Sequence, residues 1–516
     1  MAAIVTWAVG GMTLPLAASG AADAVPTQLV AKAYTEAWGR LPTAFEWRSA
    51  TRELTTAGCS AHSVGRFLRK FYVAPRFEQL GYDDASRLLA LFRGVLNRDP
   101  DRDGFAHYSA ALTADTPWAD VVDDLLSSAE FTTGLLPRVC GPTPSYGWGS
   151  TPALAVPASG EGFAGGTGAE LQALLSKAAP GSTVWLAKSA LVRVDAPVIV
   201  PSGVTLATVG RPGTSRYAAM ARLVRNSLFA GEVVRIMPGA RLDSVWVDGQ
   251  RSAVVRPPLQ GGTGVNVWLV GGSVVNSRLS ESSGWTSLQG GTNVHLDERL
   301  PDITGPCYGF IARNLVTAYA SSHDGDFSDG ISSYCDNTVI EDNEVVDTTD
   351  VGIIIFPPSF DTPQRSQVRF NTVISAGNSG YGAYAADPTF GHLKPPDFTG
   401  SSVHDNVFWT GARTHFDIGL AVGTRAWFGT TSSTGTGASF TGNGTGGLVA
   451  RVAAGIAVSG MAGVTVTGNA VEVGFADEAS PCPRAVVGAS VSAGYASGSI
   501  QPFTDVLYQS CITTGR

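Results

Sequence analysis

The sequence predicts a mainly β protein in which a right-handed parallel β-helix, a solenoid, follows a small all-α domain. Glycine is abundant, at 62 of 516 residues, and charged residues make up only 15%, which leaves few candidates for surface helices. Helical periodicity is confined to the first part of the chain, while Val, Ile, Thr, Asn and Gly dominate the second half. An Asn-centred turn recurs there at near-constant spacing, as in a repeat architecture.

Residues 1–24 are expected to form a signal peptide. Residues 4–18 are apolar and small, and Ala22-Asp23-Ala24 has the A-x-A form of a signal-peptidase site, although Met1-Ala2-Ala3 carries no Lys or Arg. No later apolar run approaches the ~20 residues that cross a bilayer, so we expect no membrane span. The protein is therefore expected to be secreted or held at the cell surface.

Six cysteines fit export, because an oxidising compartment leaves even numbers of Cys behind. None has the C-x-x-C spacing of a zinc site. Since the cysteines fall two by two along the chain, pairing of neighbours is the simplest connectivity. The expected disulfides are Cys59 with Cys140, Cys307 with Cys335, and Cys482 with Cys511.

The net charge of −8, with Lys and Arg scattered along the chain, excludes nucleic acid as a partner. A nucleic-acid binder needs basic residues gathered into a patch or stripe that neutralises phosphates, and the sequence has none.

Residues 27–140 are predicted to be a helical module with an internal repeat. Residues 37–42, AWGRLP, align with residues 95–100, VLNRDP, and each copy has the pattern helix, Arg-x-Pro turn, helix. The second copy, over residues 91–131, resembles a helical domain of unknown function that is appended to bacterial secreted and surface proteins. The resemblance implies attachment to a cell-surface component rather than chemistry.

The acidic turn of the second copy, from Asp99 to Gly104, imitates the start of a calcium loop. Its twelfth position is Ala110, where such a loop needs a bidentate Glu. We therefore favour a carboxylate-capped helix turn over a calcium site.

Residues 141–160, rich in Pro, Gly and Ser, are expected to be an interdomain linker, and the β-helix with a C-terminal tail is expected over residues 161–516. Thr167 and Glu170 have the spacing of a capping box for a short helix with Leu171 and Leu174 on its apolar face. A helix before many short strands is the expected entrance of a solenoid.

The repeat of the β-helix is marked by Asn-centred turns. The spacing from Asn314 to Asn343 is 29 residues and from Asn343 to Asn371 is 28, which suits a coil of three strands whose turns stack about 4.8 Å apart. Because Asn tolerates the left-handed region, we expect these residues to adopt it and to stack. Two further turns, at Asn406 and Asn469, continue the series.

Residues 198–206, the Val247-Asp248-Gly249 coil and residues 329–345 resemble the pectate-lyase-like parallel β-helix superfamily, over about residues 160–475. The resemblance implies the fold and leaves the activity open, since the superfamily includes lyases, hydrolases, epimerases and inert surface proteins. The paired-Asp motif and the Gly-His-Gly of polygalacturonases are both missing, which disfavours pectin hydrolysis.

The densest polar cluster supplies the candidate catalytic residues. Asp329 and Asp350 each precede an apolar strand in successive coils, so we expect them to stack as a carboxylate pair, with Asp417 extending the ladder. A carboxylate pair suits glycoside hydrolysis, because like charges raise the pKa of one member. The candidates are His323, Asp326, Asp329 and Asp350.

A lyase would need different groups, namely a cation that neutralises a uronate carboxylate and a base that removes a proton. The candidate substrate-binding residues, in longer loops and coils, are Arg365, Tyr381, Tyr384 and Lys394. No cofactor is established by these patterns, and Ca²⁺ is the candidate ion. Further aromatic candidates for stacking on sugar rings are Trp285, Tyr308, Tyr334 and Trp409.

Two functions stay open at this point. The first is a carbohydrate-active enzyme, a glycoside hydrolase or polysaccharide lyase, acting on an extracellular polysaccharide. The second is a non-catalytic surface or adhesive β-helix that binds glycans, in which each Asp before a Gly only caps the backbone of a turn. The length of the loops over residues 357–400 favours the first.

Overall fold

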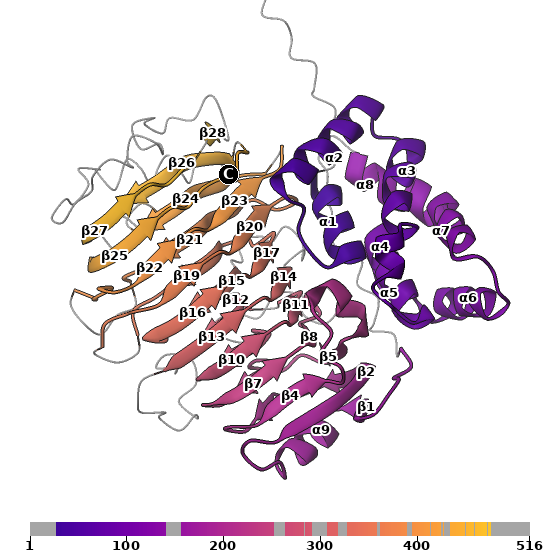
Figure 1. The fold of residues 1–516 in the computed structure, drawn as a ribbon, viewed down its shortest axis with the longest axis horizontal. Coiled ribbons are helices and arrows are strands. Elements are labelled where there is room, and N and C mark those ends of the chain that lie inside the picture. The colour runs from indigo at the N-terminus through magenta and orange to yellow at the C-terminus, as the bar shows by residue number, and fades with distance from the viewer. Residues whose placement is uncertain are drawn as a thin grey trace, which may run out of the picture.

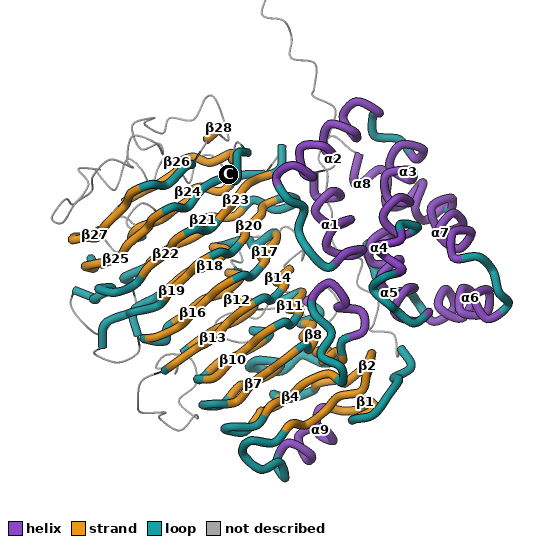
Figure 2. Tube along the Cα trace, viewed as in Figure 1, coloured by secondary structure: helices purple, strands orange, loops and turns teal. Residues whose placement is uncertain are grey.

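The computed structural model describes residues 27–140, 156–251, 264–282, 284–291, 307–317, 328–358, 362–389, 395–412, 414–424, 427, 434–448, 450–458, 460–471 and 473–475. The expected fold class is confirmed, since a β-helix of parallel strands lies beside a group of helices (Figures 1 and 2). The expected signal peptide, most of the linker, and the tail with Cys482 and Cys511 lie outside the described residues.

Three columns of parallel strands form the β-helix. The first column contains β4 (Thr205–Thr208), β7 (Ala240–Asp243), β10 (Gly272–Val275), β13 (Tyr308–Ala312), β16 (Asn337–Glu341), β19 (Gln367–Arg369), β22 (Ser402–His404), β25 (Gly435–Thr441) and β27 (Met461–Thr467). The second contains β5 (Ala221–Arg225), β8 (Val245–Asp248), β11 (Arg278–Ser280), β14 (Leu315–Thr317), β17 (Glu344–Val346), β20 (Thr372–Ser375) and β23 (Val407–Thr410).

The third column contains β3 (Val198–Val200), β6 (Val234–Ile236), β9 (Val267–Leu269), β12 (Thr286–Gly290), β15 (Asp329–Ser333), β18 (Val351–Ile355), β21 (Gly380–Ala386), β24 (Phe416–Val422), β26 (Ala450–Val458) and β28 (Val473–Phe475). Side chains such as Ile331, Ile353 and Ile355 point into the interior and join one continuous core with those of the other columns. This burial on the inner face, about 25 cal/mol per Å² of apolar surface, is the main stabilising term of each coil.

The entrance of the β-helix is formed by β1 (Phe163–Thr167), α9 (Gly168–Leu175) and β2 (Thr183–Val194). The expected capping box is present, because Thr167 accepts a hydrogen bond from the Glu170 amide and Glu170 accepts one from the Thr167 amide. Leu171 packs into the interior, whereas Leu174, placed on the same face by the sequence, is 44% exposed.

The Asn residues form a buried ladder between the first and second columns, as their spacing predicts. Each side-chain amide donates to the side-chain oxygen of the next Asn, for example from Asn343 to Asn371 at 3.0 Å, and to a backbone carbonyl. The expected left-handed conformation is wrong by one position, since the residue before each Asn adopts it, as Asp342 does at φ 53°. The ladder runs through Asn314, Asn343, Asn371, Asn406, Asn443 and Asn469.

The helical part contains two runs of helices, at the places where the sequence predicts two copies of one unit. The first copy contains α1 (Thr27–Trp38), α2 (Ala44–Ala57), α3 (Ala61–Tyr72) and α4 (Pro75–Glu78); the second contains α5 (Asp84–Leu96), α6 (Arg102–Thr113) and α7 (Trp118–Ser127), followed by the π-helical turn η1 (Glu130–Leu135) and α8 (Leu136–Cys140). The aligned residues Gly39 and Asn97 both have left-handed backbones after the first helix of each copy. We call α1 to α8 the helical domain.

The acidic turn of the second copy caps a helix. Asp101 accepts a hydrogen bond from the Gly104 amide at 2.7 Å, and Asp99 is buried in ion pairs with Arg93 and Arg222. Among the described residues, no group of three or more His, Cys, Asp or Glu side chains is arranged to hold a metal ion.

The helical domain packs against the second column of the β-helix (Figure 1). One apolar core contains Val95 and Phe67 from the helices together with Trp246, Val346 and Trp409 from the β-helix. Trp409, a candidate for sugar stacking, is therefore covered by the helical domain. None of the described helices combines the length and apolar character that a bilayer span requires.

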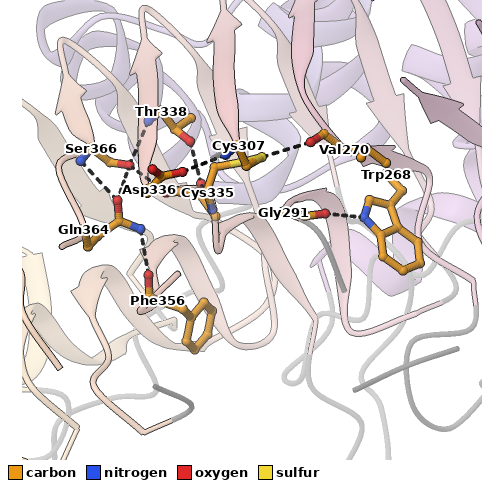
Figure 3. The surroundings of a disulfide bond; sticks show 11 residues. Trp268, Val270, Gly291, Cys307, Cys335, Asp336, Thr338, Phe356, Gln364 and Ser366 are labelled. Atoms are coloured by element: carbon orange, nitrogen blue, oxygen red, sulfur yellow. Dashed lines mark hydrogen bonds between the residues drawn. A yellow bond between two sulfur atoms is a disulfide. The ribbon is translucent and has the colours of Figure 1, made fainter. Parts of the chain in front are cut away.

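Two of the three expected disulfides lie within the described residues, and both are present: Cys59 with Cys140 and Cys307 with Cys335. Cys307 and Cys335 precede the neighbouring strands β13 and β16, so their bridge joins successive coils (Figure 3). The Cys307 amide also donates to Asp336 at 2.7 Å. The bridge lies one residue after Tyr334, an aromatic residue of the third column.

Candidate functional site

The outer face of the third column carries acidic and aromatic side chains together. Outward residues of the strands from β15 to β24, and of the turns that flank them, pack on one another outside the β-helix, while the alternate residues fill its interior. We call this surface the acidic–aromatic face. Its residues are Asp329, Tyr334, Asp350, Phe356, Tyr381, Asp387 and Trp427.

Asp329 opens β15 and is 9% exposed. One carboxylate oxygen accepts a hydrogen bond from the Val351 amide of the next coil at 2.9 Å, and the other accepts one from the Ser332 hydroxyl at 2.7 Å. Burial raises the pKa of Asp329 well above its usual value, and the neighbouring Asp350 carboxylate raises it further. Asp329 thus caps the next coil, as the non-catalytic alternative predicts, and also favours its protonated form.

Asp350 is not in line with Asp329. The register of β15 and β18 pairs Ile331 with Ile353, so Val351 lies beside Asp329, and the Asp350 amide donates to the Ser328 carbonyl. The expected stack of two carboxylates is therefore offset by one position, because Asp350 belongs to the turn before β18 rather than to the strand. The two carboxylates are nevertheless close enough for Asp350 to raise the pKa of Asp329.

Tyr334 lies at the centre of the acidic residues. Burial raises the pKa of its hydroxyl well above the usual value, and the carboxylates of Asp329, Asp387 and Asp350 add to the effect. Its ring stacks on Phe356 with centroids 4.3 Å apart and an angle of 4° between the planes. A hydroxyl with a raised pKa donates hydrogen bonds and is poorly suited to act as a base.

Asp387, which sequence reasoning missed, also faces this site. It accepts hydrogen bonds from the Thr389 amide at 2.8 Å and the Thr424 hydroxyl at 2.7 Å, and burial raises its pKa. The sequence did carry a signal for Asp387, because it follows the small apolar residues Ala385 and Ala386, as an acidic turn residue does at the end of a strand.

Tyr381 and Trp427 form the apolar edge of the face. Their rings lie edge to face, with centroids 6.4 Å apart. The Trp427 ring covers Gly382, where a Cβ atom would lie 3.1 Å from the indole, so a larger residue there would push against the ring. Trp427 is 7% exposed, and its buried indole N–H has no hydrogen-bond partner among the described residues.

Asp417 extends the series, as expected, at the register position of Tyr381. Burial raises its pKa to about 6, against the opposing effect of His415, whose Nε2 lies 3.5 Å away. The order along this column is therefore acidic, aromatic, acidic, at Asp350, Tyr381 and Asp417.

Comparisons with known proteins identify part of the helical domain. Residues 70–134 match the model of a domain of unknown function, DUF4214. No curated protein matches the chain significantly. Two similar solved structures are an alginate lyase from Paenibacillus sp. str. FPU-7, with 11% identity, a TM-score of 0.26 and coverage of 60% of this chain and 96% of that one, and a mutant of the periplasmic alginate epimerase AlgG, with 10% identity, a TM-score of 0.25 and coverage of 60% and 68%.

The structure separates the other sequence candidates. Tyr384 is inside the β-helix, where its hydroxyl donates to the carbonyls of Asn371 and Val407, so it does not reach the outer face. Arg365 is exposed at a different corner, beside Gly400. Three candidates, His323, Asp326 and Lys394, lie outside the described residues.

Proposed function

We propose that the protein is a secreted or cell-surface glycoside hydrolase that acts on an extracellular polysaccharide. Asp329 serves as the general acid and Asp350 as the base or nucleophile. The observation that supports this assignment is the buried Asp329 carboxyl, whose pKa is raised by burial and by the adjacent Asp350 carboxylate. Glycosidases use two such carboxyls, one protonated and one ionised.

The roles follow from the difference between the two environments. Asp329 is enclosed and holds its proton, which it gives to the glycosidic oxygen as the bond to the anomeric carbon breaks. Asp350, in a turn and half-buried, takes a proton from the attacking water or bonds the anomeric carbon itself. Water is added across the bond in either case, and Asp329 regains its proton over the cycle.

The same face fits a lyase less well. A lyase removes a proton beside a uronate carboxylate, which must be neutralised, whereas burial and neighbouring carboxylates are the chief influences on Asp329 and Tyr334. The raised pKa of Tyr334 also opposes its use as a base. The stacked Tyr334 and Phe356 rings suit the apolar face of a sugar.

The test is the release of reducing ends from a panel of neutral and acidic polysaccharides, with unsaturated-uronate absorbance followed in parallel. Asp329→Asn and Asp350→Asn are compared with Asp342→Asn, which changes an exposed Asp at a distant corner of the β-helix. We expect reducing ends from the wild type and Asp342→Asn only, with a loss of at least about 100-fold in the other two. Absorbance would favour a lyase, and binding without products would favour the adhesive β-helix.

A further inference from the structure

The connection between β17 and β18, residues 347–350, belongs to two surfaces at once. Its last residue, Asp350, lies on the acidic–aromatic face, while its first, Asp347, is fully buried beneath the helical domain. Asp347 has a φ of 57°, a left-handed conformation that is uncommon for residues other than Gly, although Asp adopts it more often than most, and side-chain hydrogen bonds hold it here.

Gln28, in the first turn of α1, supplies part of that hold. Its side-chain Nε2 donates to Asp347 Oδ2 at 3.0 Å, and the side chain is buried. The other Asp347 oxygen accepts from the amides of Ala376 at 2.6 Å and Gly377 at 2.9 Å. The Gln28 amide group also lies directly against Gly377, where a Cβ atom would come within 1.9 Å of Gln28 Cδ.

Gln28 therefore contacts two turns that lead into neighbouring strands of the third column. Residues 347–350 end at Asp350, and residues 376–379 lead into β21, which carries Tyr381 on the acidic–aromatic face. The Tyr381 amide in turn donates to the Asp350 carbonyl at 2.9 Å. A displacement of either turn would move the residues of the face together.

Helix α1 is well placed to hold these turns, because it is fixed on the β-helix at several points. The Leu41 amide, just after α1, donates to Glu344 at the start of β17 at 3.0 Å. Glu36 forms a buried ion pair with Arg278 of β11. Contacts from α1 and from Leu41, three residues after the end of α1, thus reach both ends of β17, and Figure 1 shows α1 beside this part of the β-helix.

We propose that the helical domain acts within its own chain, with Gln28 as a positioning residue that fixes the turns carrying Asp350 and Tyr381. The effect of Gln28 on catalysis rests on the proposed function, whereas its effect on the two turns does not. The sequence resemblance implied attachment to a cell-surface component, whereas these contacts give the helical domain an internal target.

The test compares Gln28→Ala and Gln28→Glu with Arg48→Ala. Arg48 donates to the Gly447 carbonyl at 2.9 Å, so Arg48→Ala removes a different contact between the helical domain and the β-helix. Amide hydrogen exchange is measured in full-length protein for the peptides that contain residues 347–351 and 376–382. We expect faster exchange, by on the order of tenfold, in both peptides of Gln28→Ala and in neither peptide of Arg48→Ala.

Gln28→Glu adds a readout that general loosening of the helical domain would not change. The Asp347 side chain accepts hydrogen bonds from backbone amides and from Gln28, all of which are uncharged. Two facing carboxyls share a proton at pH 5 and repel each other at pH 8, so exchange in these peptides should be slow at pH 5 and fast at pH 8, relative to wild type at each pH.

Unchanged exchange in Gln28→Ala would overturn the proposal, as would equal acceleration by Arg48→Ala. Activity separates this proposal from the proposed function. If the wild type cleaves a polysaccharide, Gln28→Ala should lower kcat by about tenfold and leave KM within about twofold. If the wild type cleaves nothing on the panel, the glycosidase assignment fails, while the exchange result still decides the positioning role.

Discussion

Glu36 in α1 and Arg278 in β11 form a bidentate ion pair, with distances of 2.7 and 3.1 Å, in which neither side chain is exposed. Tyr217 donates to the same Glu36 carboxylate at 2.6 Å, and the Arg278 guanidinium lies 3.9 Å from the centre of the Tyr217 ring. The pKa of Glu36 is lowered, because the attraction of Arg278 and Lys32 exceeds the effect of burial. A charge is therefore kept inside the interface between the helical domain and the β-helix.

We expect Glu36→Gln to lower the free energy of unfolding by about 3–5 kcal/mol, since Arg278 would remain buried without its counter-charge. Urea unfolding at pH 7 measures the change. Arg69→Ala is the control, because its ion pair with Asp123 is exposed and should contribute at most about 1 kcal/mol. Equal effects of the two substitutions would show that burial of the Glu36 pair is unimportant for stability.

The Asn ladder gives a second prediction about stability. Asn371 donates to Asn406 and to the Ile340 carbonyl, and accepts from the amide and side chain of Asn343. Asn371→Ala leaves these buried partners unsatisfied, so we expect a loss of about 2–4 kcal/mol. Asn469→Ala, at the end of the ladder, should cost less than half as much, and thermal denaturation of both variants measures the two losses. Equal losses would mean that the ladder does not act through its internal hydrogen bonds.

The fold could be predicted further than the site because the two depend on different kinds of information. Each Asn turn meets a local requirement of the backbone, so the stacking of the Asn residues could be predicted from their spacing in the sequence. Asn443 was missed because Gly442 and Gly444 flank it instead of apolar residues. Asp329 and Asp350 were found from their positions before strands. The offset between the two residues could not be predicted, because the register of a turn residue depends on how it pairs with the neighbouring coil. The sequence does not specify that pairing.

Tyr384 illustrates the same limit. It follows Gly382 and Ala383 in a strand, and alternation alone does not say which face is inner. The interface of the helical domain was also beyond reach, since Glu36 and Arg278 are 242 residues apart and carry no shared local pattern.

The Asp347 carboxyl predicts a pH dependence of stability. Burial raises its pKa from 3.8 to about 6 in the folded protein, against the opposing hydrogen bonds of the residue 376–378 amides and Gln28. The folded state therefore binds more protons than the unfolded state between about pH 4 and 6, so stability falls as pH rises through this window and the penalty is complete above it.

Asp347→Asn should remove that dependence. The Asn oxygen can accept from the Ala376 and Gly377 amides, and a flipped Gln28 amide can accept from its NH₂ group. We expect the melting temperatures of the variant and the wild type to be similar at pH 4. At pH 8 the variant should melt at a higher temperature, because its free energy of unfolding should be larger by on the order of 3 kcal/mol. A variant that is less stable at pH 8 would contradict the assigned sign.

The titration of Asp329 tests the candidate site without any substrate. Burial is the first cause of its raised pKa, and the Asp350 carboxylate is the next, followed at a smaller level by Asp387. Removing a neighbouring negative charge makes ionisation easier, so Asp350→Asn should lower the pKa of Asp329, Asp387→Asn should lower it less, and the exposed-corner control Asp342→Asn should leave it unchanged.

The ¹³C shift of the labelled Asp329 carboxyl, followed from pH 4 to 10, gives these pKa values. Hydrogen bonds from the Val351 amide and the Ser332 hydroxyl favour the ionised form of Asp329, so an Asp329 pKa below 4 that does not respond to Asp350→Asn would indicate a capping role alone. A raised pKa that falls in the order given would instead establish the unequal carboxyl pair on which general-acid catalysis by Asp329 depends.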